Sequence, residues 1–197
     1  DFNRAGVPLM EIVTEFPPDI SNPDEAKEYI SLLRQTLVYL GVCDGKMEHG
    51  SLRCEPNISI REEGAERYGT KTELKNLASF RAVQLGVQYE VSRQADILQS
   101  GGTVTQETRG WDEAKESSYS MRAKEEENDY RYFPDPDLAT MVFTDEDIES
   151  ARRSLPELPL AKKARYMESL GLSEYDAEVL TAEIDRAIFF ETILECG

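Results

Sequence analysis

The residues that can do chemistry alternate along one segment, from Ser51 to Arg61. Because successive strand residues point to opposite faces of a sheet, this alternation predicts a strand with one polar and one apolar face. A row of directed donors and acceptors can bind a phosphate, a ribose or a carboxylate, although the solvated face of an antiparallel sheet explains the same pattern. The polar face carries Ser51, Arg53, Glu55, Asn57, Ser59 and Arg61, and the apolar face carries Leu52, Cys54, Pro56, Ile58 and Ile60.

A second polar row follows on the next predicted strand, Gly69 to Leu77. It presents Lys71, Glu73 and Lys75 on one side, two ammonium groups around one carboxylate. A surface ladder of ion pairs would have the same pattern and contribute about 0.2–1 kcal/mol per pair. Residues 46–81 hold seven Lys or Arg against six Glu, whereas the whole chain of 197 residues carries −17. We therefore expect a local site for a phosphate-bearing ligand and not a generic nucleic-acid surface.

Glu11 is a candidate metal ligand. In a predicted strand from Val7 to Thr14 it alternates with Leu9 and Val13, so its carboxylate shares a face with apolar side chains,. An unpaired charge is costly there, whereas Mg²⁺ takes carboxylate and phosphate oxygens. A strand-end position or a buried arginine partner also explains this glutamate. His49, the single histidine, lies in a Gly-flanked turn without a second ligand and predicts no catalytic role,.

Several other kinds of chemistry are excluded by residue spacing. No Gly-x-x-x-x-Gly-Lys-Ser/Thr phosphate loop is present, so any ATP would be held by side chains on a sheet. Cys43, Cys54 and Cys196 are widely spaced and odd in number, which favours reduced thiols over a disulfide framework,. No apolar run approaches the roughly 20 residues of a membrane helix, so we expect no membrane partner.

The elements that must position these residues carry clear boundary signals. Asn22 with Pro23 predicts a helix start, and Gly41 its end. Ser79 predicts the start of a long helix that ends at Gly101-Gly102. This long helix has a predicted buried stripe of Phe80, Val83, Val87, Val91 and Leu98, and a hairpin of Thr103–Arg109 with Ser117–Arg122 follows it,.

After a proline-rich joint the signals are helical. Thr144 with Asp147 predicts a capping box, a helix follows from Leu155 to Leu170, and Ser173 with Asp176 opens another,. We therefore expect an α+β fold, with a mixed, largely antiparallel sheet and helices, followed by an all-helical segment. We place two domains at residues 1–140 and 141–197. The chain starts without Met and stops within a predicted helix, so we expect a piece of a longer protein.

Four blocks of sequence, in this order, closely resemble the B-subunit family of the glutamine-dependent aspartyl/glutamyl-tRNA amidotransferases. They are DFNRAGVPLMEIV at 1–13, KMEHGSLRC at 46–54, KTELKNL at 71–77 and DYRYFP at 129–134. The resemblance runs through essentially the whole chain. It implies the C-terminal part of a cradle-shaped kinase domain, followed by the start of a helical domain that contacts tRNA.

The resemblance also implies a reaction. Members use ATP and Mg to phosphorylate the side-chain carboxylate of misacylated glutamyl-tRNA(Gln) or aspartyl-tRNA(Asn), and ammonia derived from glutamine then displaces the phosphate. The family has a glutaminase A subunit and a small C subunit as partners, in the cytoplasm or in an organelle matrix. This piece alone would be inactive, because its metal site and ammonia source are incomplete. The implied roles are metal binding for Glu11, catalysis for Arg53, Glu55, Asn57, Lys71, Glu73 and Lys75, and cofactor binding for Ser51, Asn76 and Arg81.

Two alternatives remain at this point. The archaeal glutamyl-specific homologue of the subunit resembles the chain in the same blocks, although the inserted synthetase-like domain of that homologue leaves no trace here. A non-catalytic module that docks tRNA would use the polar sheet face to bind acceptor-stem phosphates without ATP turnover.

Overall fold

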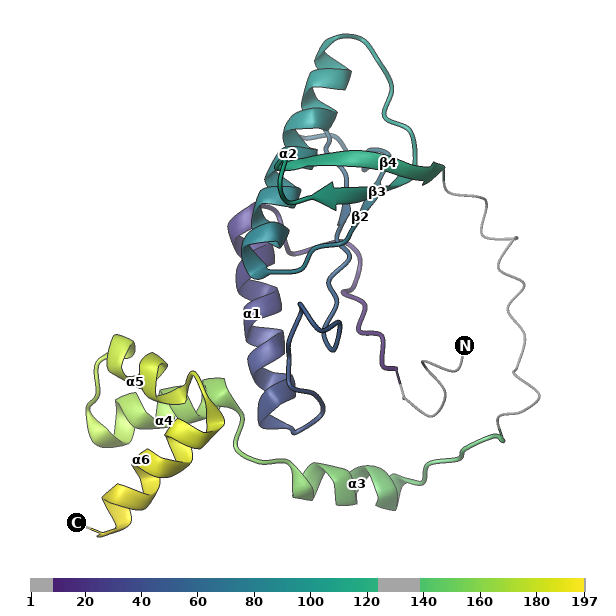
Figure 1. The fold of residues 1–197 in the computed structure, drawn as a ribbon. Helices are drawn as coiled ribbons and strands as arrows, with labels where there is room; N and C mark the ends of the chain where they lie inside the picture. Colours follow the sequence, from purple (N-terminus) through teal and green to yellow (C-terminus); the bar gives the residue numbers. More distant parts are fainter. Residues whose placement is uncertain (1–8, 124–138, 197) are drawn as a thin grey trace.

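The computed structural model describes residues 9–123 and 139–196 and has an α+β fold (Figure 1). A four-stranded sheet in the order β1-β2-β3-β4 lies in the first part of the chain. The β1/β2 and β3/β4 pairs are antiparallel and β2/β3 is parallel, which confirms the predicted mixed, largely antiparallel sheet. The strands are β1 (Asn57–Ile58), β2 (Thr72–Lys75), β3 (Glu107–Asp112) and β4 (Ser117–Ala123).

The first two helices begin where their caps predict. Oδ1 of Asn22 accepts hydrogen bonds from the backbone N–H groups of Asp24 and Glu25, both at 3.0 Å, and α1 (Pro23–Tyr39) follows. Oγ of Ser79 accepts from the N–H of Ala82 at 3.0 Å at the start of α2 (Phe80–Gln99). Each cap satisfies backbone donors that have no partner within the helix.

α2 packs against the sheet through a stripe that includes Val83 and Val87, which are buried with Leu74 and Trp111 of the strands. The helix and sheet approach closely at Gly86, where an added Cβ would lie 2.7 Å from Cδ2 of Leu74. The stripe ends earlier than predicted. Leu98 lies in the last turn of α2 and is 45% exposed, so its place in the core was a wrong prediction.

The strands are shorter than the alternation predicted. β1 covers two residues of the expected 51–61 segment, and β2 covers four of the expected 69–77. A ladder exists only where a partner runs alongside, and β1 pairs with β2 alone,. The faces are nevertheless as predicted over 52–58: Leu52 and Ile58 are buried, and Arg53, Glu55 and Asn57 are exposed.

The predicted strand around Glu11 is wrong for residues 9–14, which have no strand conformation in the structure. No strand of the described residues lies beside this segment, so its backbone groups have no ladder partner,. Leu9 is 91% exposed, Val13 is also exposed, and Glu11 is exposed with them. Residues 7 and 8 of the prediction, like the block at 129–134, lie outside the described residues.

Helices follow from residue 145 onward, as predicted. They are α3 (Asp145–Ser154), α4 (Pro159–Leu170), α5 (Glu174–Thr181) and α6 (Ile184–Cys196). Thr144 and Asp147 form the predicted capping box, and Oγ of Ser173 accepts from the N–H of Asp176 at 3.1 Å. α4 begins four residues later than predicted, since Leu155 is extended before Pro156 and the helix starts at Pro159,. The division at residue 140 stays a prediction.

The helical part contacts α1 at a buried point. The hydroxyl of Tyr39 donates to the carbonyl oxygen of Thr181 at 2.6 Å, and Nε2 of Gln35 donates to the same oxygen at 2.8 Å.

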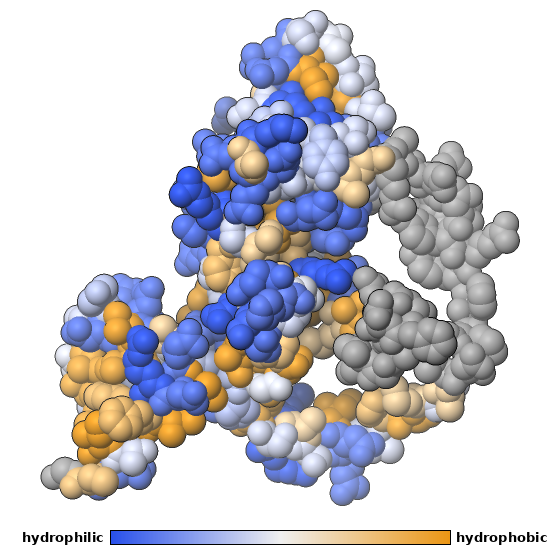
Figure 2. Space-filling view, in the orientation of Figure 1, coloured by the Kyte–Doolittle hydropathy of each residue, from blue (hydrophilic) through white to orange (hydrophobic). Residues whose placement is uncertain are grey.

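Figure 2 shows apolar side chains gathered over the segment that leads into α3, where Met141, Val142 and Phe143 are exposed. Within residues 9–123 and 139–196, no helix is long and apolar enough to span a bilayer.

Candidate functional site

Strand register gathers polar residues on the sheet face opposite α2. Leu74 faces α2, so its neighbours Glu73 and Lys75 point to the other side,. Glu73 lies opposite Asn57 on β1 and opposite Thr108 on β3. Residues that the sequence separates by up to 51 positions therefore share one surface, which supports a site built by the sheet itself.

Lys75 lies between two carboxylates on this surface. Its Nζ atom is 2.5 Å from Oε2 of Glu55 and 3.8 Å from Oε1 of Glu73. The hydroxyl of Thr108 donates to Oε2 of Glu73 at 2.9 Å. These side chains are partly to largely shielded from water, which strengthens their electrostatic interactions relative to an open surface,. The three charges with Thr108 form the candidate site.

The candidate site can do two things chemically. A lysine held by carboxylates is a positioned cation whose ammonium group can pair instead with an oxygen of an incoming phosphate. The carboxylates that it leaves can then bind an amine or a metal cation. A magnesium site is not complete in the described part of the chain, where no three His, Cys, Asp or Glu side chains gather. Glu11 is exposed there and belongs to no such group of three. The described residues therefore do not by themselves fit magnesium.

Four of the sequence-predicted residues lie around this site and others do not. Glu55, Asn57, Glu73 and Lys75 come together as described above. Lys71 and Arg53 are exposed, and neither forms an ion pair among residues 9–123 and 139–196. Ser51 is engaged elsewhere, because its hydroxyl bonds to the carboxylate of Asp44 and accepts from the N–H of Lys46 at 3.1 Å.

Asn76 borders the site at the end of β2. It has a positive φ of 65°, in the left-handed region that asparagine tolerates better than most residues,. Its amide Nδ2 donates to the hydroxyl of Tyr119 on β4 at 3.4 Å. Asn76 therefore lies between the candidate site and the ring of Tyr119, and its role in cofactor binding stays a prediction.

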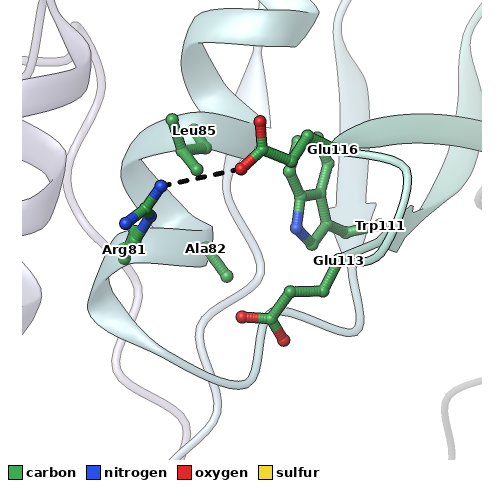
Figure 3. A pocket seen from close by; sticks show the side chains of 6 residues that line it. All are labelled: Arg81, Ala82, Leu85, Trp111, Glu113 and Glu116. Carbon is green, nitrogen blue, oxygen red and sulfur yellow. Dashed lines mark ion pairs between the residues drawn. The ribbon is translucent and has the colours of Figure 1, made fainter.

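Arg81 lies apart from the candidate site, in the first turn of α2. Its guanidinium is 3.6 Å from the carboxylate of Glu116, at a hollow of about 310 Å³. Figure 3 shows these two side chains facing each other, with Glu113 on another side and the Trp111 indole forming a wall. The indole N–H of Trp111 is buried and has no hydrogen-bond acceptor in the part of the chain that the structure describes.

A buried charged network on the α2 side of the sheet was not predicted. Glu90 is fully buried, and its carboxylate accepts from Nε and Nη2 of Arg93 at 2.9 and 2.6 Å and from the hydroxyl of Thr72 at 2.6 Å. Arg109 of β3 lies 3.6 Å away. The signal was present, because Glu90 continues the helical spacing of Val83 and Val87 and thus had to be buried,.

The network determines the charge state of Glu90. Burial acts to raise the pKa of its carboxyl, but hydrogen bonds from Arg93, Thr72 and Gln94 outweigh it and hold that pKa below the ordinary value,.

Cys54 behaves differently: burial, together with the nearby charge of Glu55, raises the pKa of its thiol to about 11. Cys54 is therefore a protonated thiol at neutral pH, and no thiolate nucleophile stands beside the candidate site.

The fold is an α+β domain whose candidate site consists of strand side chains, without a glycine loop. The family profile described as the GatB/GatE catalytic domain matches residues 1–149. The chain belongs to this family.

Curated relatives agree with the family. The chain is 53% identical over 197 residues to the B subunit of the aspartyl/glutamyl-tRNA(Asn/Gln) amidotransferase of Brevibacillus brevis and 55% identical over 197 residues to that of Solidesulfovibrio magneticus, in each case over 100% of the chain. It is 56% identical over 191 residues, 97% of the chain, to that of Persephonella marina. The chain spans 40–41% of the length of these relatives.

Proposed function

We propose that the chain is part of the B subunit of a tRNA-dependent amidotransferase and that the sheet face around Lys75 activates the aminoacyl side chain. The observation that supports this most is the position of Lys75, between Glu55 and Glu73 on a strand from one of the family-like blocks. The relatives are named for a reaction on aminoacyl-tRNA. Such a reaction requires a carboxylate to become an acceptor for ammonia.

The proposed activation step is a phosphoryl transfer. A side-chain carboxylate oxygen of glutamyl- or aspartyl-tRNA bonds to the γ-phosphorus of ATP, the bond to the β,γ-bridging oxygen breaks, and ADP leaves. Ammonia then attacks the acyl carbon, loses a proton, and phosphate leaves with its C–O electron pair to give the amide. The protein contributes position and charge neutralisation, since phosphoryl transfer needs little covalent participation from side chains.

Each residue of the candidate site has a proposed part in this step. The ammonium of Lys75 neutralises a phosphate oxygen, and Lys71 and Arg53 add cationic charge at the edge of the face. Glu73, oriented by Thr108, and Glu55 bind the α-amino group of the aminoacyl ester, with Asn57 beside them. Cofactor roles for Ser51 and Arg81 have no support from geometry, because their side chains are engaged with Asp44 and Glu116.

ATP is the proposed phosphoryl donor, and its magnesium is expected to need ligands beyond the described residues. Glu11 is proposed as one of them. The proposed partners are a glutaminase subunit that supplies ammonia, a small third subunit, and the misacylated tRNA. Since the chain spans about two fifths of its relatives, we expect activity from the full assembly and none from this chain alone.

The test uses the full-length assembly with ATP and glutamyl-tRNA, and it measures formation of the phosphorylated aminoacyl-tRNA. Lys75→Ala and Glu11→Gln are each expected to lower its rate at least tenfold. The matched control is Lys115→Ala, an exposed lysine in the turn between β3 and β4. Unchanged rates in both variants would remove the site assignment. Retained tRNA binding without ATP turnover in the unmutated assembly would instead support a docking module.

A further inference from the structure

Tyr119 lies across the sheet face that carries the candidate site. It is the β4 partner of Gly110 on β3, and Gly110 is in turn the partner of Lys75 on β2. A Cβ added to Gly110 would lie 2.5 Å from Cζ and 3.0 Å from Cε1 of the Tyr119 ring. The ring therefore covers Gly110 at a distance that only glycine permits.

Two contacts hold this ring in place. The backbone of Gly110 lies beneath the ring, and the hydroxyl of Tyr119 accepts a hydrogen bond from Nδ2 of Asn76 at 3.4 Å. The phenol therefore reaches from β4 across β3 to the end of β2. A tyrosine held by two contacts at its hydroxyl end loses little conformational entropy when a ligand packs on it, which is why such rings serve as rigid contact surfaces,.

The outer side of the ring remains available. Tyr119 is 47% exposed although its inner side rests on the sheet. Lys75 lies on β2, two strands from β4 at the same level of the register, and the ring extends over Gly110 of the intervening β3. Asn76 lies at the hydroxyl edge of the ring. An aromatic face thus borders a cation that can hold phosphate and an amide that can donate or accept hydrogen bonds.

We propose that Tyr119 is a platform on which a nucleobase stacks, with Gly110 as the residue that allows the ring to lie there and Asn76 at the base edge. Bases stack on aromatic side chains exposed on sheets. In a nucleotide the base is joined through the ribose to the phosphate, and Lys75 can bind that phosphate. The inference rests on the proposed function for the phosphate partner. The base comes from ATP or from the 3′ end of the tRNA, which share this chemistry.

The test measures dissociation constants of the full-length assembly by calorimetry for ATP, for the trinucleotide CCA and for inorganic triphosphate, which has no base. Tyr119→Ala is expected to weaken ATP or CCA about five- to 150-fold and to leave triphosphate unchanged. Tyr119→Phe keeps the ring and is expected to remain within about twofold of the unmutated assembly. Tyr175→Ala, at an exposed tyrosine of α5, is the matched control.

The three probes separate the outcomes. Loss of ATP binding alone assigns the platform to the nucleotide, and loss of CCA binding alone assigns it to the tRNA end. If Tyr119→Ala weakens neither ligand, or weakens triphosphate equally, the platform is disproved. The proposed function fails separately, when the unmutated assembly binds these ligands but forms no phosphorylated aminoacyl-tRNA.

Discussion

The hydroxyl of Thr72 donates a 2.6 Å hydrogen bond to Oε1 of Glu90, a carboxylate without exposed surface. Thr72 faces α2, whereas Glu73, the next residue of β2, faces the candidate site,. The amide of Gln94 connects the same network to β1, since its Nε2 donates to the carbonyl oxygen of Ile58 at 3.0 Å. The buried side of the sheet thus fixes the strands whose other side carries the candidate site.

Removal of this carboxylate is expected to destabilise the fold strongly. Glu90→Ala removes the fully buried anion between Arg93 and Arg109, and leaves Glu107 as the remaining carboxylate beside both guanidinium groups. Breaking a buried ion pair costs about 3–5 kcal/mol, and we expect a decrease toward the lower end of that range in the free energy of unfolding, because Glu107 still pairs with both arginines. Urea denaturation at pH 7 measures it, with the exposed α2 residue Gln88→Ala as control. Equal midpoints for the two variants would contradict the role of the network.

Glu90 also predicts an acid-sensitive fold. Its pKa is below the ordinary value of 4.5 in the folded chain, so folding favours the ionised form. Its contribution is complete above pH 4.5 and is lost as pH falls through the lower folded pKa. The free energy of unfolding should decrease over this acidic range in the unmutated chain. Glu90→Gln, which does not titrate, should show a smaller decrease between pH 5 and pH 3. Parallel curves would exclude Glu90 as the titrating group.

The helices could be predicted because their boundaries are local. Asn22, Ser79 and Thr144 each cap a helix through atoms within three residues, and such contacts need no distant partner,. Strands depend on what lies beside them. The apolar segment around Leu9 has strand composition but no neighbouring strand in the described part, so composition alone gave a wrong result there.

The same distinction explains the candidate site. Alternation predicted that Glu55 and Asn57 share a face of one strand and that Glu73 and Lys75 share a face of the next. The pairing of β1 with β2 places these two strand faces on the same side of the sheet. Thr108 was missed because its place beside Glu73 depends on the parallel pairing of β2 with β3, which no local pattern encodes. Tyr119 and its glycine partner were missed for the same reason.

The contact between α1 and α5 gives a second stability prediction. Tyr39→Phe removes the donor to the carbonyl oxygen of Thr181 but keeps the ring, while Gln35 still donates to that oxygen. The expected loss is about 1 kcal/mol, typical of one neutral hydrogen bond. Hydrogen exchange at α5 amides should increase together with this loss. Tyr29→Phe on the same helix is the control, and equal exchange in both variants would mean that the bond does not hold α5.

A cluster in the helical part should respond to acid. Hydrogen bonds from Arg165, with support from Lys162, lower the pKa of Glu157 to about 2. Glu191 contacts both cations; burial acts to raise the pKa of its carboxyl, but the hydrogen bonds from Lys162 and Arg165 outweigh burial and lower it. The stabilisation is therefore present above pH 4.5 and is lost toward pH 2,.

Thermal unfolding of Glu157→Gln tests this response, followed by the backbone amide signals of α4 and α6 during heating. At pH 7 the variant should unfold at a lower temperature than the unmutated chain. The difference should shrink toward pH 2, because acid and mutation remove the same charge. Glu168→Gln, at an exposed glutamate of α4, is the control. A difference that stays constant from pH 7 to pH 2 would show that Glu157 does not carry the acid response.

Thr108 is expected to act as a positioning residue for Glu73. Its buried hydroxyl donates to Oε2 of Glu73 at 2.9 Å, and Thr108→Val removes this donor with almost no change in shape. Loss of orientation at Glu73 should lower the rate of aminoacyl-tRNA phosphorylation by the full assembly about tenfold, equivalent to about 1.4 kcal/mol. Thr108→Ser keeps the hydroxyl and should restore most of the rate, although it removes a buried methyl group. Thr105→Val, at an exposed threonine before β3, is the matched control. A merely structural role predicts the opposite order, since serine loses more packing than valine. A serine variant slower than the valine variant would therefore reject the positioning role and leave Thr108 as a packing residue.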